Sequence, residues 1–229
     1  MAGRRRWEVW NEPDIGYGQS TPEEYFKVYD YSADAVKRAL PGIRIGGPTT
    51  TGPNGEKAAA YLRAFLDHAV KGKNFATGRT GSPLDYISFH AKGRPTVFEN
   101  HVRMGSEKQM NDVSKGFEIV ASYPSLKKLP IIIGESDPEG CAACSARFKP
   151  QNAYRSGTTY SSYTAATFAR KNELAARHGI NFEGAVTWAF EFEDKPYFDG
   201  FRDLATNGID KPVLNVFRMF GMMEGNGWR

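Results

Sequence analysis

The sequence has only two cysteines and no long apolar run. Its longest apolar stretches, such as residues 131–133, are far shorter than the roughly 20 residues that cross a bilayer. We therefore expect no transmembrane helix and no membrane partner. The first residues, Met1 to Arg4, are not followed by an apolar stretch, so no secretory signal is visible. This leaves the compartment open and favours a soluble, cytoplasmic protein.

The two cysteines, Cys141 and Cys144, are spaced as C-x-x-C. A zinc site needs two more ligands, and neither a second cysteine pair nor a His-x-x-x-His pattern follows. A thioredoxin-like motif opens a helix, whereas this pair lies in a loop rich in Gly, Pro and Arg. An incidental or loop-stapling role is favoured over metal or redox chemistry.

The net charge is also small, at only +4, and part of it comes from residues 4–6, all arginine. A triple arginine can contact nucleic acid, but a solvated chain end is favoured, and we expect no nucleic-acid partner. Hydrophobic content of 40% and charged content of 24% exclude the disordered and fibrous classes. A chain of 229 residues can bury one sizeable core, and we assign residues 1–229 to one domain.

Short apolar runs alternate with longer segments of helical periodicity. This pattern predicts strands at residues 7–10, 43–47, 84–89, 130–134 and 182–189, with helices at about 22–40, 57–70, 107–123, 160–178 and 212–222. Such alternation indicates an α/β fold with parallel strands and right-handed crossovers. About five units are present, three fewer than a complete (β/α)8 barrel. Residues 135–157 form a long loop and are a candidate functional loop.

Reactive residue types cluster just after the predicted strands, where the loops of a parallel α/β barrel converge. These positions hold Asn11-Glu12-Pro13, Gly47-Pro48-Thr49, His90, Glu135-Ser136-Asp137, and Trp188 with Glu191, Glu193 and Asp194. This clustering is the strongest functional signal from the residues themselves.

Two glutamates at strand ends match the requirement of glycosidic bond cleavage, in which one carboxylic acid protonates the leaving oxygen and one carboxylate attacks. We assign Glu12, which lies near Trp7 and Trp10, as the acid/base, and Glu135 as the nucleophile. Gly134 leaves room for another group to approach Glu135 closely. Taken singly, each glutamate has a structural reading as a turn or helix-cap residue. Together, at the same end of parallel strands, they favour catalysis.

The remaining candidates also have two readings. His90 is either a satisfied core histidine or a group that orients the nucleophile or holds a sugar hydroxyl. Trp188 either packs in the barrel or stacks under a sugar ring. Glu191, Glu193 and Asp194 either form a solvated acidic loop or accept hydrogen bonds from sugar hydroxyls.

Several of these segments resemble one enzyme family. Residues 10–13 (WNEP) resemble the acid/base motif after the fourth strand of clan A glycoside hydrolases, and residues 132–135 (IIGE) resemble the nucleophile motif after the seventh. Residues 135–141, 187–194 and 208–215 are similar to family 39 in particular. That family contains β-xylosidases and α-L-iduronidases, which retain anomeric configuration and use no metal or organic cofactor.

The resemblance implies a carbohydrate substrate and roles for several residues. Asn11 would bind the sugar 2-hydroxyl, His90 would lie on the sixth strand near Glu135, and Glu193 and Asp194 would contact the terminal sugar. Cleavage of terminal β-linked xylose is the favoured activity. An α-L-iduronidase-like activity and a non-catalytic carbohydrate-binding fragment are the alternatives.

The resemblance also implies a TIM-barrel type of fold of which only strands 4 to 8 are present. An open sheet of five strands would expose apolar edges and faces. We therefore expect low stability of the isolated chain, or a homo-oligomer that completes or covers the sheet.

Overall fold

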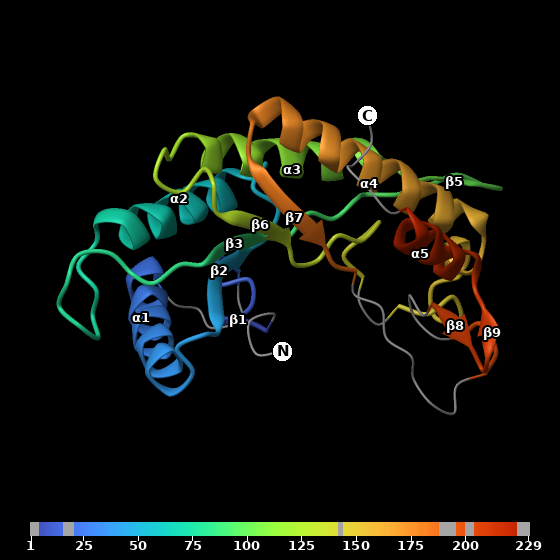
Figure 1. Ribbon diagram of the computed structural model, residues 1–229. Coiled ribbons are helices and arrows are strands. Elements are labelled where there is room, and N and C mark those ends of the chain that lie inside the picture. Colours follow the sequence, from blue (N-terminus) through green and yellow to red (C-terminus); the bar gives the residue numbers. More distant parts are fainter. Residues whose placement is uncertain (1–4, 16–20, 142–143, 188–195, 200–203, 224–229) are drawn as a thin grey trace. The chain divides into compact units, whose positions relative to one another are not determined.

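The computed structural model describes residues 5–15, 21–141, 144–187, 196–199 and 204–223. Within these residues the chain forms two compact units (Figure 1). Unit 1 comprises residues 1–91, 111–135 and 174–186, and unit 2 comprises residues 92–110, 136–173 and 187–229. Each unit is described by itself below.

Unit 1 contains a five-stranded sheet in the order β1-β2-β3-β6-β7, and all four pairings are parallel. The sheet confirms the α/β class, and each strand is followed along the chain by a helix. The strands are β1 (Arg6–Glu8), β2 (Arg44–Thr50), β3 (Tyr86–Phe89), β6 (Pro130–Ile133) and β7 (Asn181–Ala185). The helices are α1 (Pro22–Ala39), α2 (Glu56–Lys71), α3 (Ser106–Ala121), α4 (Thr158–His178) and α5 (Pro212–Met222).

The expected elements lie within a few residues of the observed ones, except at the ends of two strands. The first strand stops at Glu8 because Trp10 adopts a left-handed backbone conformation, with φ of 70°. The last strand ends at Ala185, and residues 188–189 of its predicted range lie outside the described residues. Three short elements were not expected because they are too short to show periodicity: β4 (Thr96–Val97) with β5 (Val102–Arg103), β8 (Ala205–Thr206) with β9 (Ile209–Asp210), and the 3-10 helix η2 (Pro150–Ser156).

Helix α1 begins as its sequence predicts. Thr21 accepts a hydrogen bond from the Glu24 amide at 3.3 Å, and the Glu24 carboxylate accepts one from the Thr21 amide at 2.7 Å. This capping box typically stabilises a helix by about 0.5–2 kcal/mol. The helix buries Tyr25 and Tyr29, whose rings lie 5.9 and 4.8 Å from the ring of Phe65 in α2.

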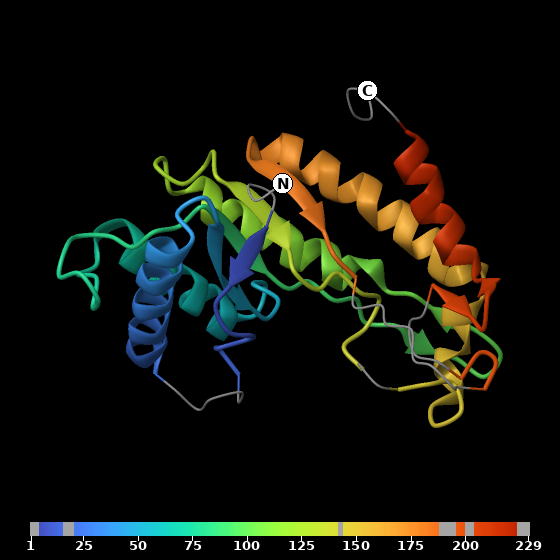
Figure 2. The same cartoon turned by 60° about the horizontal axis from the view of Figure 1, so that its bottom comes forward.

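The sheet is curved enough that its two edge strands interact through their side chains. Arg6 on β1 forms an ion pair with Glu183 on β7, and Arg44 on β2 lies 3.8 Å from the same carboxylate. Figure 2 shows the backbones of the two edge strands, β1 in blue and β7 in orange. Among the described residues, no further strand pairs with the outer edge of β1 or of β7. None of the described helices combines the length and apolar character that crossing a membrane requires.

Unit 2 contains a lysine that is buried without a hydrogen bond. Lys171 in α4 has no exposed surface, and no acceptor among the described residues reaches its Nζ atom. The Nζ atom lies 4.7 Å from the centre of the Phe168 ring. Burial lowers the pKa of Lys171 to about 7, although the charge of Asp137 acts in the opposite direction.

This lysine makes stability depend on pH. Because its pKa is about 7 in the folded chain and about 10.4 when unfolded, the unfolded state binds more protons between these values. The Lys171 contribution therefore raises the free energy of unfolding as pH rises from 7 to 9, by up to about 2 kcal/mol. We expect Lys171→Met to be more stable at pH 7 and to lose this part of the rise.

Denaturant unfolding at pH 7 and pH 9 measures the effect. The matched control is Arg170→Met, which removes the neighbouring exposed cation of the same helix. Parallel pH dependences for Lys171→Met and the unsubstituted chain would contradict the prediction.

Candidate active site

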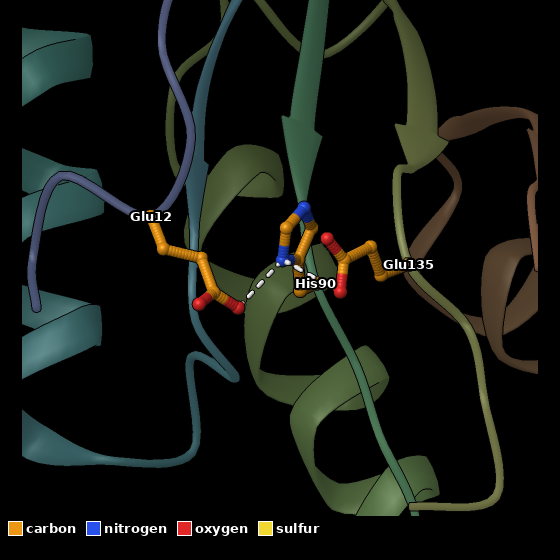
Figure 3. A group of neighbouring side chains, drawn as sticks. All are labelled: Glu12, His90 and Glu135. Carbon is orange, nitrogen blue, oxygen red and sulfur yellow. Dashed lines mark hydrogen bonds and ion pairs between the residues drawn. The ribbon is translucent and has the colours of Figure 1, made fainter. Parts of the chain in front are cut away.

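Three buried residues meet beyond the C-terminal ends of β1, β3 and β6 in unit 1 (Figure 3). Glu12 follows β1, His90 directly follows β3, and Glu135 follows β6. All three are at most 9% exposed. The structure brings these three residues together, and their roles in catalysis stay a prediction.

His90 lies between the two carboxylates, as Figure 3 shows. Its Nδ1 atom is 2.8 Å from Glu12 Oε1 and 3.7 Å from Glu135 Oε2. The ring nitrogen and one oxygen of each glutamate all lie within 4.8 Å of one another. The shorter contact links His90 to Glu12, whereas the sequence had indicated a role beside Glu135.

Backbone hydrogen bonds fix the positions of these residues. The His90 amide donates to the Thr50 carbonyl at 2.8 Å, and the Ala91 amide donates to the Glu135 carbonyl at 2.9 Å. The Glu12 amide donates to the Thr49 carbonyl at 3.1 Å. The end of β2 therefore binds the backbone of the Glu12 segment on one side and that of His90 on the other. Thr49 was among the strand-end residues that the sequence indicated, whereas the contribution of the Thr50 carbonyl gave no sequence signal.

Gly134 allows the close approach that its position predicted. A Cβ atom at this residue would lie 3.2 Å from His90 Nε2 and 3.7 Å from Glu8 Oε2. The first distance is tighter than most side chains tolerate, so the glycine leaves room for the imidazole.

Glu8 on β1 is a third carboxyl group that the sequence analysis missed. The residue as a whole is exposed, but desolvation of its carboxyl group raises its pKa above the ordinary value. The nearby Ser88 side chain and the charge of His90 oppose this shift, and the charge of Glu135 adds to it. Period-two alternation along β1 places Glu8 on the same face as Arg6, and this was the available signal.

The same cluster has the chemistry of a metal site. Carboxylate oxygens and a histidine nitrogen bind ions such as Zn²⁺ at about 2.0–2.2 Å. Glu12, His90 and Glu135 can each supply one such atom. The expectation that no metal takes part stays a prediction.

The other predicted site residues are placed only in part. Asn11 is exposed beside buried Glu12. Trp188, Glu191, Glu193 and Asp194 lie outside the described residues. In unit 2, Cys141 and Cys144 form a disulfide, in agreement with the loop-stapling interpretation.

The loop around the disulfide contains a buried ion pair. Arg155 lies 2.6 Å from Glu139 and donates hydrogen bonds to the carbonyls of Cys141 and Cys144 at 2.9 and 2.7 Å. These bonds, together with the disulfide, link η2 to the segment that follows Glu135 along the chain.

Comparison with known proteins identifies the family. The model of glycosyl hydrolases family 39 matches residues 3–228. The chain belongs to this family. The family 39 resemblance of the sequence motifs is thereby confirmed.

Two curated relatives illustrate the range of this likeness. A β-xylosidase from Caldicellulosiruptor saccharolyticus is 34% identical over 231 residues, which cover 96% of this chain and 42% of that protein. An α-L-iduronidase from Mus musculus is 30% identical over 140 residues, covering 58% of this chain and 20% of that protein. The chain thus spans less than half the length of these relatives.

Solved structures share the fold at low sequence identity. A bacterial orthologue of human α-L-iduronidase superimposes with a TM-score of 0.72 at 20% identity, covering 95% of this chain and 36% of that one. A glucosidase from Croceicoccus marinus gives a TM-score of 0.61 at 17% identity, covering 94% and 40%. Both likenesses concern the fold alone.

The close approach at Gly134 generates a prediction. In Gly134→Ala the new methyl group displaces the His90 ring by a few tenths of an ångström, and we expect the glycoside hydrolysis predicted for Glu12 and Glu135 to slow by about ten- to a hundredfold. Steady-state kinetics on an aryl glycoside measure the effect. Gly184→Ala is the matched control, because a Cβ atom at this glycine of β7 meets nothing within 4 Å. Equal activities of the two variants would argue against the steric role of Gly134.

Proposed function

We propose that the chain is a retaining, exo-acting glycosidase that cleaves terminal β-linked xylose from xylo-oligosaccharides or aryl xylosides. The observation that carries the proposal is the spacing of Glu12 and Glu135, whose carboxylate oxygens lie within 4.8 Å of each other. Retaining glycosidases hold their two carboxyl groups about 5–5.5 Å apart, whereas inverting enzymes separate them by about 6.5–9.5 Å. The spacing supports retention.

In the first step, Glu135 attacks the anomeric carbon of the sugar and forms an ester bond to it. The glycosidic bond breaks, and its electron pair goes to the leaving oxygen, which takes a proton from the carboxylic acid of Glu12. Because Glu135 must be ionised and Glu12 protonated at this point, the two groups need different proton affinities.

In the second step, Glu12 acts as a base. It removes a proton from a water molecule, whose oxygen attacks the anomeric carbon and displaces Glu135 as a carboxylate. Two inversions at one carbon give net retention. His90 supports both steps, because its Nδ1 atom is within hydrogen-bond distance of Glu12 and 3.7 Å from Glu135.

The proposed identity of the sugar rests on the likeness to the relatives. The β-xylosidase likeness extends over 96% of the chain and supports a xyloside. An α-L-iduronide is the second candidate, supported by 30% identity to the mouse iduronidase over 140 residues. Asn11, Trp188, Glu191, Glu193 and Asp194 are the proposed sugar-binding residues.

The five parallel strands are proposed to correspond to strands 4 to 8 of a TIM-type barrel. The curvature that brings Arg6 to Glu183 supports this correspondence. The edges of β1 and β7 carry unpaired backbone groups in the described part of the chain, and such edges favour association.

Substitution of the two glutamates tests the catalytic assignment. We expect Glu135→Ala to lower kcat on an aryl β-xyloside by more than about 10⁴-fold, since no nucleophile remains. Glu12→Ala should lower it by about 10²–10⁴-fold on a substrate with a poor leaving group. Glu23→Ala, which removes an exposed glutamate of α1, is the control. Equal rates for all four proteins would refute the assignment.

Substrate choice is tested by comparing kcat/KM for matched aryl glycosides. A 4-methylumbelliferyl β-xyloside should be hydrolysed faster than the corresponding α-L-iduronide. The opposite order would favour the second candidate. Saturable sugar binding in calorimetry without turnover of either substrate would instead identify a non-catalytic carbohydrate-binding protein.

The open sheet edges predict that the isolated chain self-associates. Light scattering coupled to gel filtration should give a mass above 25.5 kDa or a polydisperse peak. A compact, stable monomer would contradict this expectation.

A further inference from the structure

Asp14 lies two residues after Glu12 and is 2% exposed. Both of its carboxylate oxygens accept hydrogen bonds from a single residue. Oδ1 accepts a hydrogen bond from the Thr51 amide at 2.9 Å, and Oδ2 accepts one from the Thr51 hydroxyl group. Hydrogen bonds to an ionised carboxylate are stronger than neutral ones, and two of them fix the direction of the group.

The segment before Asp14 needs such a restraint. Trp10 and Glu12 both have positive φ, at 70° and 44°, a backbone region that residues other than glycine rarely adopt. Each such conformation costs about 1–3 kcal/mol and persists only where surrounding contacts hold it. The contacts here include Glu12 N to Thr49 O at 3.1 Å and Thr49 Oγ1 to Trp10 O at 3.2 Å.

Three successive threonines at the end of β2 thus hold different parts of the site. The Thr49 carbonyl binds the Glu12 amide, the Thr50 carbonyl binds the His90 amide, and Thr51 binds the Asp14 carboxylate. The Glu12 turn is tethered on one side by Thr49 and on the other by Asp14. Loss of the Asp14 contacts would remove one of these two tethers.

We propose that Asp14 is a positioning residue that holds Glu12 in place for proton transfer. The inference rests on the proposed function, in which Glu12 is the acid/base. A proton donor must lie about 2.6–3.2 Å from the atom that it protonates. Displacement by about 1 Å costs on the order of 10²-fold in rate. Asp14 therefore acts on the step that needs acid catalysis and not on the attack by Glu135.

Leaving-group dependence separates these two effects. A 2,4-dinitrophenyl β-xyloside loses its aglycone without protonation, whereas a phenyl β-xyloside requires it. We expect Asp14→Ala to lower kcat/KM for the phenyl substrate by about ten- to a hundredfold. For the dinitrophenyl substrate, kcat/KM should change less than about threefold, because formation of the glycosyl-enzyme needs only Glu135. Added azide should raise kcat for the dinitrophenyl substrate, because azide attacks the glycosyl-enzyme without a base.

Two further variants distinguish the proposed positioning effect from a general loss of folding. Thr51→Val keeps the shape of the side chain and the amide contact but removes the hydroxyl bond, so we expect the same selectivity with a smaller loss. Asp67→Ala removes an aspartate of α2 whose side chain is 46% exposed, and it should leave the hydrolysis of both substrates unaffected. Equal losses on both substrates for Asp14→Ala and Thr51→Val, or no loss on either, would overturn the proposal.

A crystal structure of Asp14→Ala supplies a test that does not require turnover. The distance between His90 Nδ1 and Glu12 Oε1, now 2.8 Å, should lengthen beyond hydrogen-bond reach. An unchanged distance would reject the positioning role even if the chain proved inactive on both xylosides. Inactivity of the unsubstituted chain, by contrast, would count against the proposed function alone.

Discussion

The site depends on one imidazole that lies between two carboxyl groups and separates them. Two carboxyl groups at this spacing repel each other whenever both are ionised, and the repulsion is strong where water is largely excluded. His90 lies between Glu12 and Glu135, with its Nδ1 atom 2.8 and 3.7 Å from them. A protein that holds such a pair must fix all three backbones, because side chains left to relax would move apart. The backbone does this through the amides of Glu12, His90 and Ala91.

The sequence predicted the fold well because its elements are long and strongly periodic. The helix that begins at Thr21 has a complete capping box, and the buried strand at residues 130–133 is almost uniformly isoleucine. The positions of Glu12, His90 and Glu135 followed from the rule that loops after parallel strands converge. Pattern and topology together were enough to bring three residues, 78 and 45 positions apart in the sequence, to one place.

The supporting residues could not be predicted in the same way. Asp14 and Thr51 interact across 37 positions of sequence, and neither departs from an ordinary turn composition. Glu8 lies within a strand, where a carboxylate is usually read as a solvent-facing residue. Lys171 falls on a helix whose periodicity gives no sign that a charged side chain is buried. Side-chain partners of this kind depend on three-dimensional distances that periodicity does not encode.

The attachment of His90 has a consequence for how the site responds to motion. The amide of His90 is bound to the Thr50 carbonyl at the end of β2. The next amide along the chain, that of Ala91, is bound to the carbonyl of Glu135. Two successive amides after β3 therefore join the end of β2, which also binds the Glu12 amide, to the backbone of Glu135. Sliding of β3 against β2 or β6 would stretch one of these two hydrogen bonds, so the same bonds that place the imidazole also oppose its movement relative to the glutamates.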